Sequence, residues 1–209
     1  MVVAQSWFYT FSWWIIWVVL KILLRFRTEG THHVPMTGGV LLASNHASYV
    51  DPPLVGVCLH RELSFLAKRE LFRSSLFGKV ILSLHAIPIN RSGVTHHTLK
   101  TVVERLREGR AVLMFPEGTR TKNGRLGVAK AGIGFLVAMS GCPVVPVAIT
   151  GTYRVWRTIL TGRQVTVRFG APIAPQDLGT HSLRKEGYRC ISDHLMQHIA
   201  ALHSGYQSG

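Results

Sequence analysis

The stretch GVLLASNHASYVDPP, residues 39–53, joins an apolar run to a polar loop and then to two prolines. The mostly apolar residues 39–44 are typical of a buried strand. Pro52 and Pro53 predict that a helix begins directly after the loop, with Asp51 as its capping residue. A strand that passes through a short loop into a helix is characteristic of an α/β protein.

The same alternation of short apolar runs and helical stretches continues along the chain. Further strands are expected at 62–67, 86–90, 111–115, 143–149 and 165–169. Helices are expected at 52–60, 72–84, 94–108, 127–140 and 182–203. This pattern predicts an α/β fold, a mixed sheet flanked by helices. Ligands of such sheets bind near the carboxyl ends of strands, so a site is expected in the segments that follow them.

The N-terminus is the most apolar and aromatic part of the sequence. WFYTFSWWIIWVVLKILLRF, residues 7–26, contains four of the five tryptophans, and its only charges are Lys21 and Arg25. The uncharged stretch before Lys21 approaches the ~20 residues of a spanning helix, yet tryptophan also prefers the headgroup level of a bilayer. We expect residues 1–27 to form an N-terminal membrane-anchoring helix, monotopic or single-span, and residues 28–209 to form one functional domain. The basic residues after the apolar stretch predict that this domain lies at the cytoplasmic face. A helix buried in the core is the alternative.

The charge balance is strongly basic, with 24 Lys and Arg against 10 Asp and Glu, a formal net charge of +14. Such an excess favours a polyanionic partner: nucleic acid, an anionic membrane surface or a phosphorylated substrate. The basic residues are dispersed and no nucleic-acid-binding motif is present, so nucleic acid is not the expected partner.

Cysteine and histidine spacing predicts neither disulfides nor a metal site. Cys58, Cys142 and Cys190 are far apart in apolar surroundings, which is typical of reduced core thiols. His194 and His198 have metal-ligand spacing, but they lack the glutamate of an HExxH motif and are interpreted as surface residues.

The first chemical constellation is His46 with Asp51, five positions later on one loop. A histidine accepts a proton near neutral pH. A carboxylate on its other ring nitrogen selects the tautomer and stabilises the imidazolium that forms. No serine or cysteine stands in a GxSxG setting, so the pair would activate a hydroxyl carried by a substrate. Taken alone, this spacing also arises by chance around an ordinary loop histidine.

The second constellation is FPEGTR, residues 115–120, which ends a strand and enters a loop. Backbone amides in a glycine turn at Gly118, together with the guanidinium of Arg120, make a suitable cradle for a phosphate. Glu117 would orient the arginine or bind a polar substrate group. The alternative is an ordinary turn with a solvated salt bridge.

NHASYVD, residues 45–51, and FPEGTR together resemble the first and third blocks of the glycerophospholipid acyltransferase family, the 1-acylglycerol-3-phosphate acyltransferases and their relatives. From His46 to Glu117 is 71 positions (117 − 46). The resemblance covers about residues 30 to 170, which is most of the expected domain.

The other family blocks are recognisable with one departure. Pro146 in VVPVAI corresponds to the fourth block, and Arg91 after AIPIN corresponds to the second. The family often has an aspartate directly before that arginine, where this chain has Asn90. Lys68 matches by position a lysine that helps to hold the acceptor phosphate in similar enzymes, and Arg69 beside it is the alternative.

The resemblance implies that His46 is the general base on a glycerol hydroxyl and that Asp51 orients it. The hydroxyl would attack the thioester of acyl-CoA or acyl carrier protein directly, without an acyl-enzyme, a cofactor or a metal. The substrate-binding residues implied are Lys68, Arg91, Glu117, Gly118, Thr119 and Arg120.

The implied reaction converts lysophosphatidic acid, 1-acylglycerol-3-phosphate, into phosphatidic acid at a membrane. The acceptor remains open, because Asn90 and the short chain also allow another lysophospholipid, glycerol-3-phosphate or the lyso form of an amino-acid lipid. From a different class, a non-catalytic protein that binds membranes or polyanions would have no need of both His46 and Asp51.

Overall fold

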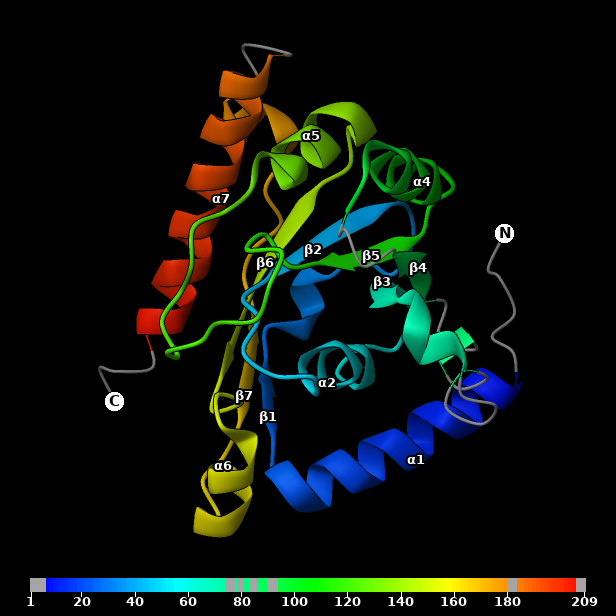
Figure 1. Ribbon diagram of the computed structural model, residues 1–209, viewed down its shortest axis with the longest axis vertical. Helices are drawn as coiled ribbons and strands as arrows, with labels where there is room; N and C mark the ends of the chain where they lie inside the picture. Colours follow the sequence, from blue (N-terminus) through cyan, green and yellow to red (C-terminus); the bar gives the residue numbers. More distant parts are fainter. Residues whose placement is uncertain are drawn as a thin grey trace.

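The computed structural model describes residues 7–73, 78, 81–82, 86–89, 94–179 and 184–205. Its described part is built around one seven-stranded sheet (Figure 1). The strands are β1 (Arg27–Glu29), β2 (Val40–Ser44), β3 (Leu63–Lys68), β4 (Ile87–Ile89), β5 (Ala111–Met114), β6 (Val144–Thr150) and β7 (Thr166–Phe169). Their order across the sheet is β1-β7-β6-β2-β5-β3-β4.

The sheet is mixed, as the sequence predicts. The five strands from β6 to β4 in this order run parallel to their neighbours. β7 is antiparallel to β6, and β1 is parallel to β7. The strands β6, β2, β5, β3 and β4 therefore end at one edge of the sheet, called here the carboxyl edge. β1 and β7 begin at that edge, because Thr150 of β6 lies opposite Thr166 and Thr166 lies opposite Arg27.

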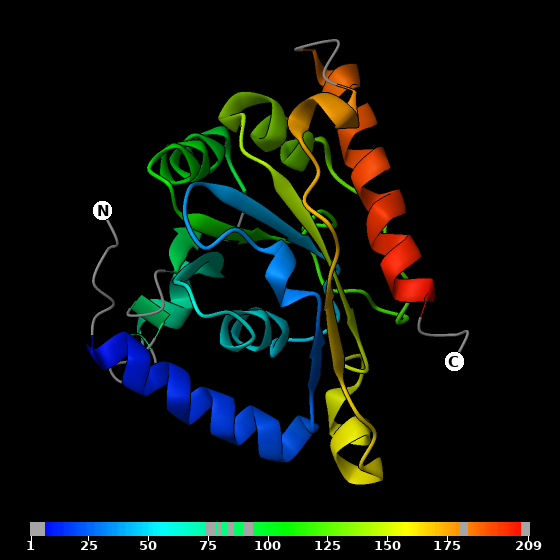
Figure 2. The ribbon, with the colours of Figure 1, turned by 180° about the vertical axis from the view of Figure 1, so that it is seen from behind.

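Helices cover both faces of the sheet (Figures 1 and 2). They are α1 (Trp7–Leu24), α2 (Asp51–Val57), α4 (His96–Arg107), α5 (Ala131–Ser140), α6 (Val155–Thr161) and α7 (Lys185–Ser204). Short 3-10 helices occur at Thr31–His33, Arg69–Arg73 and Pro175–Leu178. Successive residues of β2 point to opposite faces. Leu42 accordingly packs in the core beneath α1 and α2, and Leu41 packs in the core beneath α4, α5 and α7.

Most expected elements are confirmed within a few residues, and two were missed. β1 is three residues long and two of them are charged, so it has no apolar pattern to detect. α6 was also not predicted. It is a short helix of mostly exposed residues between β6 and β7, so its sequence has no clear pattern of buried positions. The helix expected at 72–84 lies largely outside the described residues.

Two local expectations were wrong. Val50 is the N-cap residue of α2, and Asp51 is its first helical residue with its carboxylate turned back toward the preceding loop. Pro52 and Pro53 do stand in the first turn, where the absence of an N–H costs nothing. Cys190 is exposed on α7 instead of lying in the core. Cys58 is buried as expected, and its burial raises the pKa of its thiol to about 12.

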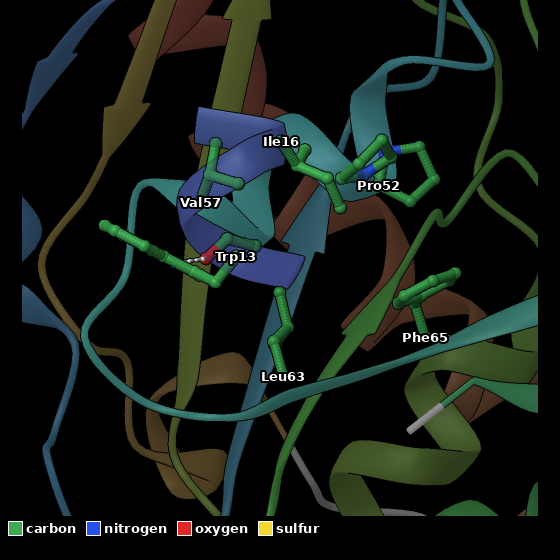
Figure 3. Close-up of a pocket in the computed structure, with 8 residues that line it drawn as sticks. Trp13, Ile16, Pro52, Val57, Leu63 and Phe65 are labelled. Atoms are coloured by element: carbon green, nitrogen blue, oxygen red, sulfur yellow. Dashed lines mark hydrogen bonds between the residues drawn. The ribbon is translucent and has the colours of Figure 1, made fainter. Parts of the chain in front are cut away.

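The N-terminal helix α1 packs one face against α2. Trp13 and Ile16 lie against Pro52 and Val57 of α2 (Figure 3). The indole Nε1 of Trp13 donates a hydrogen bond to the carbonyl oxygen of Gly56 at 3.3 Å. The crevice left between them is only about 10 Å³, the space of roughly one water molecule. Of the helices within the described residues, none has both the length and the apolarity needed to cross a membrane.

Candidate active site

The loop that follows β2 is hydrogen-bonded to the neighbouring strand β6 through the side chain of Asn45. Oδ1 of Asn45 accepts the N–H of Ile149 at 2.7 Å, and Nδ2 of Asn45 donates to the carbonyl oxygen of Ile149 at 2.9 Å. The side-chain amide therefore pairs with β6 as a strand residue would. Because Asn45 is buried, both hydrogen bonds are protected from competing water. The next residue, His46, starts from a fixed point at the carboxyl edge.

His46 and Asp51 meet, as their spacing predicts. Nδ1 of His46 lies 2.9 Å from Oδ2 of Asp51. The same oxygen accepts the N–H groups of Ala47 and Ser48, each at 2.7 Å. The side chain of Asp51 has no exposed area and that of His46 is 16% exposed. Because Oδ2 of Asp51 is an acceptor for all three of these contacts, it places the proton of a neutral imidazole on Nδ1 of His46.

The third block holds the histidine from the other side. The ring of His46 stacks on Phe115, with centroids 3.9 Å apart and an angle of 17° between the rings. Oε1 of Glu117 accepts the N–H of His46 at 3.2 Å, and the N–H of Thr121 donates to the carbonyl oxygen of His46 at 2.8 Å. Ring and backbone of His46 are thus both positioned by the segment that follows β5.

Glu117 links two loops through its carboxylate. One oxygen accepts the N–H of His46, and the other accepts the N–H of Gly127 at 3.1 Å. Burial raises the pKa of Glu117 above its ordinary value, while these two N–H donors oppose the shift. Glu117 was expected in the phosphate site, but its contacts within the described residues are those of a residue that positions His46. Binding of substrate by Glu117 stays a prediction.

The rest of the third block is exposed. Gly118, Thr119 and Arg120 lie at the surface beyond Glu117. The guanidinium carbon of Arg120 lies 3.5 Å from the ring centroid of Tyr49. Tyr49 is an exposed residue of the loop between β2 and α2, residues 45–50, called here the histidine loop. This cation–π contact holds Arg120 beside the loop that carries His46. A cation so close to the histidine loop is well placed to receive an anionic group.

Position 118 requires a glycine because of its positive φ angle and because the side chain of Lys130 lies close to it. Its φ of +69° lies in the region that favours glycine. A Cβ at this position would lie 2.9 Å from Nζ of Lys130, whose backbone N–H donates to the carbonyl oxygen of Pro116 at 2.9 Å. The turn therefore brings a second cation, Lys130, close to the backbone of the third block. The spacing of residues 115–120 alone did not reveal this lysine.

The remaining expected anion-binding residues belong to neighbouring strands. Lys68 is the exposed last residue of β3, and β3 pairs with β5 in parallel, so Lys68 ends at the carboxyl edge. β4 ends at Ile89 on the far side of β3. Arg91 lies outside the described residues. The phosphate-binding roles of Lys68 and Arg91 stay predictions.

A cavity of about 220 Å³ lies on the β6 side of the histidine. His46 lines it together with the loop at residues 121–126, the segment at residues 149–153 and His203 of α7. The hydroxyls of Thr150 and Thr152 are buried and have no hydrogen-bond partner within the described residues. Burial, with a smaller contribution from Arg168, lowers the pKa of His203. The cavity provides space for a reacting group beside the imidazole.

The fold and the site together define a class of protein. It is an α/β protein whose buried aspartate orients a histidine at the carboxyl edge of a mixed sheet, next to an exposed arginine. The chain belongs to the acyltransferase family, because the family model described as Acyltransferase matches residues 25–150. The matched range runs from the end of α1 to the end of β6 and contains His46, Asp51 and the third block.

Individual relatives agree with this assignment. The 1-acyl-sn-glycerol-3-phosphate acyltransferase of Bacillus subtilis is 29% identical over 188 residues, which cover 88% of this chain and 92% of that protein. The chloroplastic 1-acyl-sn-glycerol-3-phosphate acyltransferase BAT2 of Brassica napus is 30% identical over 76% of this chain. The match covers 48% of the plant protein, about half its length.

A solved structure shows the same fold. The 1-acyl-sn-glycerophosphate acyltransferase PlsC of Thermotoga maritima superimposes with a TM-score of 0.75, covering 96% of this chain and 82% of that chain at 23% identity. The predictions of a mixed α/β fold and of an acyltransferase are therefore confirmed.

Proposed function

We propose that this protein transfers a fatty acyl chain from an acyl thioester to the free hydroxyl of 1-acylglycerol-3-phosphate, giving phosphatidic acid. The observation that carries the proposal is the contact of 2.9 Å between Nδ1 of His46 and the buried Oδ2 of Asp51. The names of the relatives from Bacillus and Brassica support the choice of acceptor.

The geometry suits general-base catalysis by His46. With its proton on Nδ1, the imidazole has a lone pair on Nε2, which has no hydrogen-bond partner within the described residues. Nε2 would accept the proton of the acceptor hydroxyl as its oxygen attacks the thioester carbonyl. Collapse of the tetrahedral intermediate breaks the carbon–sulfur bond, and His46 returns the proton to the leaving thiolate. Asp51 would stabilise the transient imidazolium.

The acceptor phosphate would bind on the exposed side of the third block. Arg120 is held beside the histidine loop by Tyr49, and Lys130 lies close to the turn at Gly118. Guanidinium and ammonium groups form strong charge-assisted hydrogen bonds with phosphate. Lys68, at the same edge of the sheet, and Arg91 would complete the site. The donor, acyl-CoA or acyl carrier protein, serves as a substrate, and the transfer itself needs no metal.

Membrane association is part of the proposal, with residues 1–27 as the anchor and the catalytic domain at the cytoplasmic face. α1 packs through Trp13 and Ile16 on α2, whereas its other side exposes large apolar residues. The most exposed of them are Phe11 and Trp14 at 57% and Ile22 at 70%. A helix with one face on its own domain and an apolar face outward suits a monotopic position in the headgroup region.

The test is a product assay with the purified full chain. The assay offers a panel of acceptors, each once with acyl-CoA and once with acyl-loaded acyl carrier protein as the donor. The acceptors are lysophosphatidic acid, other lysophospholipids, glycerol-3-phosphate and a lyso amino-acid lipid. Phosphatidic acid is the expected product. Preference for another acceptor would overturn the proposed substrate, and the absence of product from every pair would overturn the activity.

A further inference from the structure

The short helix α6 exposes an apolar patch that its own domain does not cover. Trp156 is 55% exposed and Leu160 is 77% exposed, and the two residues are four apart on the helix. Ile159 extends the same stripe, because residues three and four apart share a helix face. Thr158 is the buried residue of the helix and faces the protein. A tryptophan and a leucine held outward on seven residues favour a contact with something apolar.

α6 lies beside the C-terminal end of α1. A Cβ added to Gly162, directly after α6, would lie 3.3 Å from a guanidinium nitrogen of Arg25, directly after α1. Both views place the two helices at the same end of the molecule (Figures 1 and 2). The apolar patches of α1 and α6 therefore belong to one end of the protein.

That end also contains the carboxyl edge of the sheet. β6 ends at Thr150, and the chain then continues into α6. α1 precedes β1, which begins at Arg27. Thr150 and Arg27 both lie opposite Thr166 of β7, so the end of β6 and the start of β1 lie at the same edge. Asn45 of the histidine loop forms two hydrogen bonds with Ile149, the residue of β6 directly before Thr150. Both helices thus extend from the edge that carries His46.

The charged residues of α6 and of the sequence on either side of it are all basic. Arg154, Arg157 and Arg163 flank its apolar stripe, and the guanidinium carbon of Arg157 lies 5.1 Å from the ring centroid of Trp156. Between Glu117 and Asp177 the sequence contains no acidic residue. Tryptophan beside arginine is the composition that favours an anionic bilayer interface, where the ring sits among headgroups and the guanidinium binds phosphate.

We infer that α6 is a second membrane contact, which inserts Trp156 and Leu160 into the headgroup region of an anionic bilayer beside α1. The inference rests on the membrane association proposed above and adds a second site to it. One helix lying on a membrane leaves the domain free to rotate about the helix axis. Contacts at both α1 and α6 remove that freedom and keep the edge with His46 toward the lipid.

The experiment is flotation of full-length variants on phosphatidylcholine vesicles with and without phosphatidylglycerol. Trp156→Ser with Leu160→Ser should lower the partition coefficient on the anionic vesicles roughly tenfold or more, since two large apolar groups lose their burial. Met36→Ser is the matched control. Met36 is 63% exposed and apolar, but it precedes β2 at the opposite edge of the sheet, so this variant should float like the unchanged protein.

A second variant tests the charges. Arg157→Gln with Arg163→Gln should lower binding about fivefold for each arginine at low salt, and only on vesicles that contain phosphatidylglycerol. Circular dichroism and thermal unfolding check that every variant is folded. Equal flotation of the Trp156/Leu160 variant and the Met36 control would overturn the inference.

The same variants distinguish membrane binding by α6 from dimer formation through α6, and they test the inference independently of the acyltransferase activity. A lipid-free dimer that becomes monomeric in the Trp156/Leu160 variant would show that a second copy covers α6, and would also overturn the inference. Flotation requires no turnover, so failure of the acyltransferase assay leaves this result unaffected. Acyl transfer between water-soluble short-chain substrates should be unchanged in the α6 variants, because the substitutions lie outside the catalytic site.

Discussion

The two halves of the candidate site differ in how the protein holds them. The histidine loop is held by hydrogen bonds of two buried side chains: Asn45 pairs with β6, and Asp51 accepts two backbone N–H groups in addition to the imidazole. The segment from Gly118 to Arg120 is exposed, and within the described residues Arg120 is held by a ring contact with Tyr49.

The difference corresponds to two kinds of chemical work. Proton transfer requires a base that is oriented before the substrate arrives, because reorientation during the reaction would add to the barrier. An anionic group supplies its own attraction, so exposed and loosely held cations can collect around it on binding. The contrast predicts that damage to the first half lowers the turnover rate, whereas damage to the second half weakens the use of one substrate.

The largest effect is expected from His46→Ala. Loss of the general base should lower kcat by about 10²–10⁴-fold, and circular dichroism should show an intact fold although the contacts of the imidazole with Asp51 and Phe115 are lost. Initial rates of phosphatidic acid formation measure the effect. A folded variant with nearly normal turnover would remove the basis for the proposed mechanism.

The next effect is expected from Asn45→Ala. The substitution leaves the buried N–H and carbonyl groups of Ile149 without their partners, which should cost about 1–3 kcal/mol of unfolding free energy. Because the histidine loop loses its attachment to β6, kcat should also fall although Asn45 performs no chemistry. Urea unfolding and initial rates check the two parts. Loss of stability without loss of rate would show that the loop does not need this attachment.

A smaller and more selective effect is expected from Arg120→Ala. The apparent KM for the phosphorylated acceptor should rise roughly tenfold, since one charge-assisted contact is lost. The KM for the acyl donor should stay nearly constant. Arg107→Ala is the control, because Arg107 is an exposed arginine at the end of α4, before β5 and so at the opposite edge of the sheet. Its apparent KM for the acceptor should stay unchanged. Equal changes for both substrates would mean that Arg120 is structural.

The smallest effect is expected from the titration of Glu117. Burial raises the pKa of this carboxyl above 4.5 in the folded protein, so the folded state binds the proton more tightly than the unfolded state. The contribution of this group to the free energy of unfolding is therefore fully present below pH 4.5 and is lost as pH rises through the raised pKa. Urea unfolding across this interval should show a smaller pH dependence in Glu117→Gln. An unchanged pH dependence would contradict a raised pKa.

Features that depend on residues close together in the sequence could be predicted, and contacts between distant residues could not. The apolar run at 39–44 and the prolines at 52–53 indicated β2 and the start of α2, because their signals lie within a few neighbouring residues. The pair His46 and Asp51 was found for the same reason, since five residues of loop can bring the two side chains together. The capping role expected of Asp51 was wrong, because its carboxylate accepts N–H groups from the loop before the helix.

The sequence by itself determined the alternation of strands and helices and the histidine–aspartate pair, and its net charge of +14 predicts an anionic partner. Only the tertiary structure decided that Asn45 pairs with Ile149, that Glu117 positions His46, and that α1 and α6 meet at one end of the molecule. These contacts join residues 71 to 137 positions apart, and no local pattern encodes them. They arise because the strand order brings the carboxyl ends of β2, β5 and β6 and the starts of β1 and β7 to one edge of the sheet, which no single segment determines.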